Sequence, residues 1–212
     1  MPAPPTPDAI DLAPPQDTEE TARAELYGLL ARLWLAPPDD ALLAQFRVAV
    51  TEAPEPGGHL ERPWHDLVAA MRGSTAAAAR DEFGALFEGV GKPEVFVYGS
   101  YYLSGALNDR PLAQLRSDLA ALGLGRDEAR METEDHVAYV FEVMRYLIAG
   151  EDAGTCNLEQ QRRFFRAHLQ PWVERLCDAV QAHPGARLWG AVAGFTRAFV
   201  EVETQGFDLL EA

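Results

Sequence analysis

The chain has 212 residues, of which 48% are hydrophobic and 24% are charged, and its formal net charge is −15 at pH 7. This composition is typical of a globular protein with enough apolar residues for a sizeable core. The negative charge argues against nucleic acid as a ligand, because phosphate binding depends on clustered lysine and arginine. An acidic surface favours basic partners or serves solubility.

The first segment, MPAPPTPDAIDLAPPQD, is rich in proline and acidic residues and predicts a disordered tail over residues 1–17. It has neither the basic start nor the apolar run of a secretory signal. No apolar run approaches the roughly 20 residues that a membrane span needs. Two cysteines, Cys156 and Cys177, are too few and too far apart for a disulfide framework. We therefore expect a cytoplasmic protein.

Helical spacing of apolar residues begins directly after the tail. A first helix is predicted over about 18–36, with a capping-box-like start and a stop at Pro37-Pro38. Three more helices are predicted before residue 88: one from Asp39 or Asp40 to Val50, a short one around 64–71, and one from Ser74 to Phe87. The inward face of the first comprises Ala22, Leu26, Leu29, Leu30 and Leu33.

The segment EGVGKPEVFVYGSYYLSG at 88–105 breaks this pattern with glycine, proline and four aromatic residues. We call it the aromatic loop. It has two interpretations that the sequence leaves open. The aromatic side chains plug the core, or they line a recognition groove, since tyrosine combines an apolar ring with a polar tip.

Helical spacing returns at Leu112 and ends at Gly123, and a charged connector follows at about 123–134 between two helical halves. Further helices are predicted up to Gly150, from Asn157 to about His183 with a break or kink at Pro171, and from Leu188 to the end of the chain. No sustained strand pattern is present. The sequence thus predicts an all-α single domain of about eight to ten helices over residues 18–212.

The segment ETEDH at 132–136 concentrates three acids and a histidine directly before an apolar helix. Metal and catalytic interpretations lack partners, because no Glu-x-x-His pair, GxSxG motif or full phosphate loop is present. Thr133, Asp135 or His136 is suited to capping the helix start. The same carboxylates would also suit an arginine ligand, which pairs with them bidentately. Such an edge beside an aromatic groove would fit a peptide with a basic end and an apolar stretch, the composition of a twin-arginine export signal.

Three segments in order, EFGALFEGVGKPEVFVYGSYYLSG, ETEDHVAYVFEVMRYL and QRRFFRAHLQPWVERL, resemble the TorD/DmsD family of redox-enzyme maturation chaperones. The resemblance spans about 18–202. It implies an all-helical, non-enzymatic, cytoplasmic protein without cofactor or metal. Such a protein would bind the apo catalytic subunit of a molybdopterin-containing oxidoreductase, or its twin-arginine signal peptide, until the cofactor is inserted, and so prevent premature export.

Carried onto this chain, the resemblance implies a peptide groove between the aromatic loop and the connector. Its residues would be Leu86, Phe87, Tyr98, Ser100, Tyr102, Glu132, Asp135 and His136, with Tyr27 approaching from the first helix. Family members often carry proline where this chain has Thr133, so a capping hydrogen bond would have to fix the connector here. We expect Thr133 and Glu134 to belong mainly to the helix start.

Alternatives stay open at this point. One alternative is an enzyme, either a helical hydrolase or a metal oxidase. The other is a member of the same family that binds a site in the mature domain of its client, without an export signal. Its assembly state would be a monomer or a domain-swapped dimer, because long helical hairpins are joined by the connector.

Overall fold

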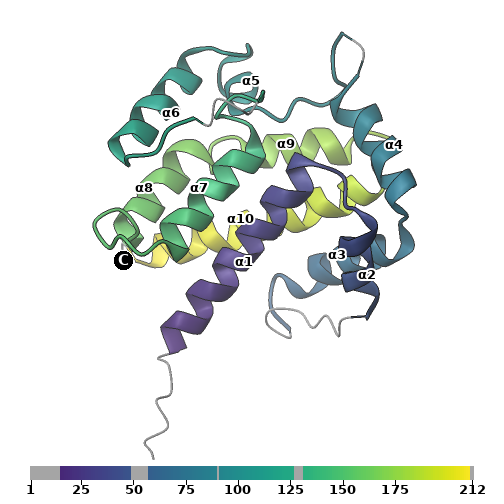
Figure 1. The fold of residues 1–212 in the computed structure, drawn as a ribbon, viewed down its shortest axis with the longest axis horizontal. Helices are drawn as coiled ribbons and strands as arrows, with labels where there is room; N and C mark the ends of the chain where they lie inside the picture. The colour runs from purple at the N-terminus through teal and green to yellow at the C-terminus, as the bar shows by residue number, and fades with distance from the viewer. Residues whose placement is uncertain (1–14, 49–56, 90, 127–130, 211–212) are drawn as a thin grey trace, which may run out of the picture.

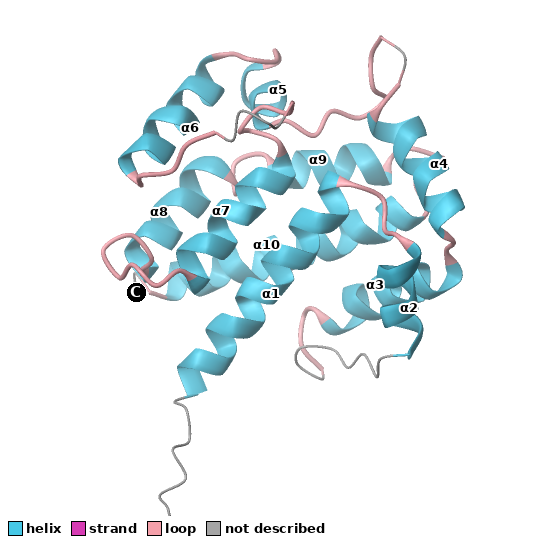
Figure 2. Ribbon diagram, viewed as in Figure 1, coloured by secondary structure: helices cyan, strands magenta, loops and turns pink. Residues whose placement is uncertain are grey.

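The computed structural model describes residues 15–48, 57–89, 91–126 and 131–210. Over these ranges the chain forms ten helices, and the described β pairing is one isolated bridge between Tyr98 and His136. The helices are α1 (Pro15–Leu35), α2 (Asp40–Val48), α3 (Glu61–Gly73), α4 (Ala76–Phe87), α5 (Gly99–Ser104), α6 (Arg110–Ala121), α7 (Val137–Ala149), α8 (Leu158–His168), α9 (Val173–Gln181) and α10 (Leu188–Leu209). Figure 2 shows this arrangement, and the predicted all-α class is confirmed.

Three helices, α1, α7 and α10, cross the centre of the molecule (Figure 1). α1 packs along α7, and α10 packs against α9 and α3. α5 and α6 lie together at one end, and α2 and α3 lie at the other (Figure 1). None of the described helices combines the length and the apolar character needed to span a bilayer. The largest fully buried side chains include Trp34, Trp172, Trp189, Phe141 and Phe199.

A buried polar cluster fixes α1 against α10. Arg23 donates to both carboxylate oxygens of Glu203, from Nε over 2.9 Å and from an Nη over 2.8 Å. The Tyr27 hydroxyl donates to the same carboxylate over 2.9 Å. A second Nη of Arg23 donates to Gln161 of α8 over 3.3 Å. Since buried charges are tolerated when they are paired and hydrogen-bonded, this cluster specifies the register of three helices.

The helix boundaries agree with the sequence in most places. α1 begins at Pro15 rather than Thr18, so residues 15–17 belong to the helix and not to the predicted tail, in keeping with the preference of proline for a first helical turn. Ala22 is exposed, because the inward face is centred on residues such as Ala24 and Leu30. The break at Pro171 is confirmed, since α8 ends at His168 and α9 begins at Val173.

Some predictions lie outside the described residues. These are the tail over 1–14, the end of the second helix at 49–50 and residues 127–130 of the connector. The remainder of the connector joins α6 to α7.

The aromatic loop contains a helix that the sequence did not predict, α5. Glycine and tyrosine are weak helix formers, so local propensity gives no signal there. The helix is six residues long and ends at Gly105 in the left-handed conformation, with φ of 82°. Its start depends on Asp135, which is distant in the sequence.

Candidate functional site

The aromatic loop and the acidic segment meet at one buried junction. Backbone hydrogen bonds run from Gly99 N to Asp135 O and from Val137 N to Val97 O, each over 2.9 Å. The Asp135 carboxylate accepts a further hydrogen bond from Ser100 N over 2.9 Å. Because the first N–H groups of a helix have no partner within it, Asp135 caps α5 from 35 residues away.

The Phe-Phe-x-x-His-Leu-x-x-Trp run closes the junction through Trp172, which is buried. A Cβ at Gly99 would lie 3.0 Å from Trp172 Cε2, tighter than most Cβ contacts, so glycine lets the α5 backbone come this close without moving the indole. The Tyr102 ring stacks on the same indole with centroids 5.8 Å apart. Trp172 Nε1 in turn donates to His168 O over 2.6 Å. All three segments of the resemblance thus form one structural unit.

His136 is the N-cap of α7. Its Nδ1 accepts a hydrogen bond from Ala138 N over 3.2 Å, and its ring contacts Tyr98 edge-on at 5.3 Å between centroids. Burial lowers the pKa of His136 to about 4, against the opposing effect of the carboxylates of Glu132 and Asp135. The ring is therefore neutral at pH 7, as an accepting Nδ1 requires. The expectation that Thr133 and Glu134 supply the helix start is corrected, because the cap comes from His136.

The remaining side chains of the acidic segment have separate partners. Thr133 Oγ1 donates to Asp135 Oδ1 over 2.6 Å, which orients the capping carboxylate. Glu134 forms a bidentate ion pair with Arg116 of α6 at 2.8 and 3.0 Å. Glu132 accepts a hydrogen bond from the Tyr98 hydroxyl. Asp135 and His136 are thus buried within the junction, whereas Glu132 is half-buried at its edge.

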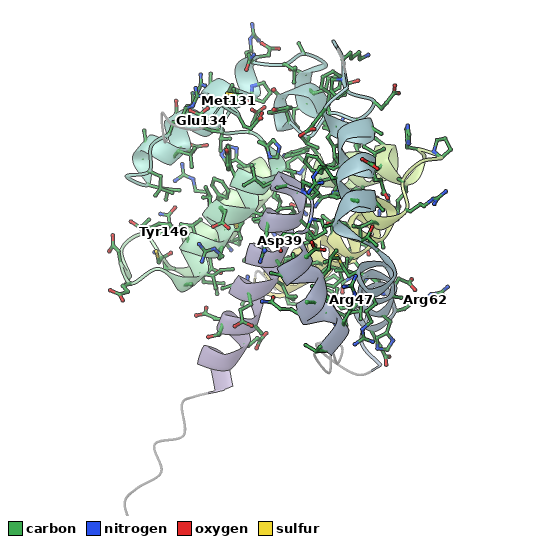
Figure 3. The ribbon with its side chains drawn as sticks, turned by 45° about the vertical axis from the view of Figure 1, so that its right-hand side comes forward. Asp39, Arg47, Arg62, Met131, Glu134 and Tyr146 are labelled. Atoms are coloured by element: carbon green, nitrogen blue, oxygen red, sulfur yellow. The ribbon has the colours of Figure 1, made fainter. Side chains whose placement is uncertain are left out.

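A groove of about 640 Å³ lies beside the junction, between α1, α6, the connector and α7. Its apolar lining comprises Ala31, Leu35, Leu119, Leu124, Ala138 and Val143, and two aromatic rings, Tyr139 and Tyr146, join them. Met131 of the connector is 90% exposed. Figure 3 shows Met131, Glu134 and Tyr146 on the α6–α7 side of the molecule, and Arg47 and Arg62 on the side of α2 and α3. An apolar lining with a polar rim is typical of a ligand groove.

The groove carries carboxylates and guanidinium groups on its rim. Glu142 pairs with Arg145 over 2.8 Å, and Glu134 pairs with Arg116. Arg32 pairs with Asp39 over 3.3 Å. Among the described residues, Glu132 is the groove carboxylate that has no basic partner. The groove therefore presents one acidic group that is available to a cation, next to an apolar surface.

The structure places the residues predicted for the site in two regions. Six of them meet at the junction, namely Tyr98, Ser100, Tyr102, Glu132, Asp135 and His136. Three pack in the core instead. Leu86 and Tyr27 are buried, and Phe87 lies with its ring centroid 5.9 Å from that of Trp34. Of all nine, Glu132 is the one that lines the groove.

Sequence reasoning missed the α7 side of the groove, whose lining includes Tyr139, Val143 and Tyr146. Their spacing of four and three residues places them on one helix face. That face lies beside the stripe that enters the core, which includes Val140, Met144 and Leu147. The signal in the sequence was that α7 carries two neighbouring apolar stripes, whereas packing against the core needs only one.

Within the described residues, no three side chains of the histidine, cysteine, aspartate or glutamate type lie close enough to hold a metal ion. His168 and Asp118 do approach each other, with Nε2 2.8 Å from Oδ2. This contact joins α8 to α6.

Comparison with known proteins finds a family model and relatives that cover most of the chain. The family model described as nitrate reductase delta subunit matches residues 54–178, which is more than half of the chain. Proteins named "Chaperone protein TorD" from three strains of Vibrio cholerae serotype O1 (Classical Ogawa 395, M66-2 and El Tor Inaba N16961) are each 24% identical over 204 residues, covering 89% of this chain and 93% of the relative. The chain belongs to the TorD/DmsD family.

Membership of the TorD/DmsD family gives the junction a context. The segments by which the chain resembles the family are the ones that cap α5, seat Gly99 on Trp172 and begin α7. They hold α5 and α6 against the central helices. The groove lies beside the junction, and Glu132 of the acidic segment forms part of its lining.

Proposed function

We propose that this protein is a cytoplasmic maturation chaperone for a molybdopterin-containing oxidoreductase. It binds the twin-arginine signal peptide of the catalytic subunit, holds the apo subunit while the cofactor is inserted, and so prevents premature export. The protein itself acts by binding rather than by catalysis. Family membership and the TorD chaperones among its relatives support the general role. The groove supports the choice of ligand.

The observation that carries the proposal is Glu132 at the edge of the apolar groove. A guanidinium group binds a carboxylate through two parallel hydrogen bonds, and a partly desolvated site strengthens them. Glu132 has no basic partner among the described residues, so an incoming arginine does not have to displace one. The apolar stretch that follows the arginines would then lie against Leu35, Val143 and Tyr139. The net charge of −15 would speed the encounter.

The buried members of the predicted site act as positioning residues in this proposal. Asp135 and Ser100 are 4% and 0% exposed and are engaged with each other, so they shape the connector rather than touch the peptide. Tyr98 holds the Glu132 carboxylate through its hydroxyl.

Glu132→Gln is expected to weaken binding of a synthetic peptide with paired arginines and an apolar tail by about ten- to hundred-fold, because it removes a charge-assisted hydrogen bond of about 1.5–3 kcal/mol. Isothermal titration calorimetry measures the change. A peptide with lysines in place of the arginines should bind wild type more weakly, since lysine lacks the bidentate fork.

The matched control is Glu174→Gln, an equal change of charge at an exposed position on α9. It should leave peptide affinity within about twofold of wild type, since exposed charges at a distance are screened by salt. Equal effects of the two variants, or no binding of the arginine peptide by wild type, would overturn the proposed ligand.

A second candidate follows from the description of the matching family model, nitrate reductase delta subunit. In this alternative the client is recognised through a site in its mature domain. Binding of the catalytic subunit with and without its N-terminal signal separates the two. Loss of binding on removal of the signal supports the main proposal, and unchanged binding supports the alternative.

A further inference from the structure

A second hollow, of about 390 Å³, lies along the same seam between α1 and α7 as the groove. Its apolar lining comprises Ala24 of α1 and Ile148 and Ala149 of α7, and Glu20, Thr21 and Glu25 of α1 form its polar side. Arg145 lines both this hollow and the groove. Its side chain therefore lies between the two spaces, and its position determines whether they are separate or continuous.

Two features of the chain keep Arg145 in this position. Its Nε donates to Glu142 Oε2 over 2.8 Å, three residues earlier on α7. On the opposite side it crosses α1 at Gly28, where an added Cβ would lie 2.9 Å from Arg145 Cδ. Glycine in the interior of a helix is less stable than alanine, because it loses more conformational freedom on folding. Glycine at position 28 therefore lowers the stability of α1 but leaves space for the Arg145 side chain.

The bonds that hold Arg145 are weak. The side chains of Arg145 and Glu142 are 49% and 44% exposed, and an exposed ion pair of this kind contributes little to stability. A tail long enough to reach the second hollow has to break this ion pair, and that cost lowers the affinity for long tails by up to about fivefold.

We propose that Arg145 is a specificity-determining residue that limits the length of the apolar segment the groove accepts. This inference rests on the proposed function, since it assumes a peptide with a basic end and an apolar tail. A short tail fills the groove and stops at Arg145. A longer tail reaches the second hollow only when Arg145 moves away from α1.

The test compares two synthetic peptides with the same paired arginines, one followed by four apolar residues and the other by eight. Arg145→Ala should strengthen binding of the long peptide by up to about fivefold, because the tail no longer has to break the ion pair between Arg145 and Glu142. Binding of the short peptide should stay within about twofold of wild type, as expected for the loss of one screened rim charge. Arg145 is half-exposed, so its removal is compatible with folding.

Two further variants separate length selection from charge. Arg32→Ala removes an equal charge from the groove at a residue that does not line the second hollow, so it should change both affinities by the same factor. Gly28→Ala leaves the charge unchanged and displaces Arg145 from α1, so it should act in the same direction as Arg145→Ala.

Equal changes of both peptides in Arg145→Ala, with both still bound by wild type, would overturn the length limit and leave the proposed function intact. If neither peptide binds wild type or any variant, the proposed function itself is overturned, and the inference falls with it.

Discussion

Glu203→Ala is expected to lower the free energy of unfolding by about 3–5 kcal/mol, the cost of removing one partner of a buried ion pair. Glu203 accepts hydrogen bonds from Arg23 and Tyr27, and the side chains of Arg23 and Glu203 are 19% and 5% exposed. Without Glu203, the guanidinium group and the hydroxyl would remain buried with lost acceptors. Chemical denaturation followed by circular dichroism measures the effect.

Glu201→Ala provides the matched control on the same helix. Glu201 pairs with His59 over 2.7 Å, but their side chains are 44% and 53% exposed. Exposed pairs contribute little, so this variant should lose less than about 1 kcal/mol. Equal losses in the free energy of unfolding for both variants would show that the buried cluster does not stabilise the packing of α1 against α10.

Asp135→Ala is expected to lower the free energy of unfolding by about 2–4 kcal/mol. Its carboxylate accepts hydrogen bonds from Ser100 N over 2.9 Å and from Thr133 Oγ1 over 2.6 Å. Both donors would be left without this acceptor, and an unsatisfied buried donor costs about 1–3 kcal/mol. The loss should be accompanied by faster amide hydrogen exchange in α5, because its N-terminal cap is removed.

Asp135→Asn separates the hydrogen bond from the charge. The amide oxygen can still accept from Ser100 N, so this variant should lose less stability than Asp135→Ala. The Asp135→Ala variant also tests whether Asp135 contacts the ligand directly. In that case Asp135→Ala would leave the free energy of unfolding unchanged and would weaken peptide binding alone.

The helices were predictable because their signals are local. The apolar residues of α7 recur at helical spacing. Proline cannot continue a helix interior, so Pro171 marks the break between α8 and α9. α5 was not predictable in this way. Its start depends on Asp135, which is 35 residues away, and its close approach to the core depends on Trp172. Neither contact leaves a pattern in the residues of α5 itself.

The candidate site was predictable in composition but not in the division of roles. Acidic residues before an apolar helix indicated either a cap or a binding edge. The structure assigns the capping roles to His136 at α7 and to Asp135 at α5. Glu132 remains at the groove. One sequence segment thus contains both roles only three positions apart, at Glu132 and Asp135. Which acid is buried depends on tertiary contacts that sequence spacing does not encode.

The most direct test of the central proposal is photo-crosslinking from the groove. A photoreactive residue replaces Val143, which lines the groove, or Leu107, which is 42% exposed and follows α5. The protein is then irradiated with a peptide that carries paired arginines and an apolar tail, and the adducts are located by mass spectrometry. We expect an adduct from position 143 that the unmodified peptide suppresses, and none from position 107. An adduct from position 107 alone would place the ligand on the aromatic-loop side and contradict the proposed groove.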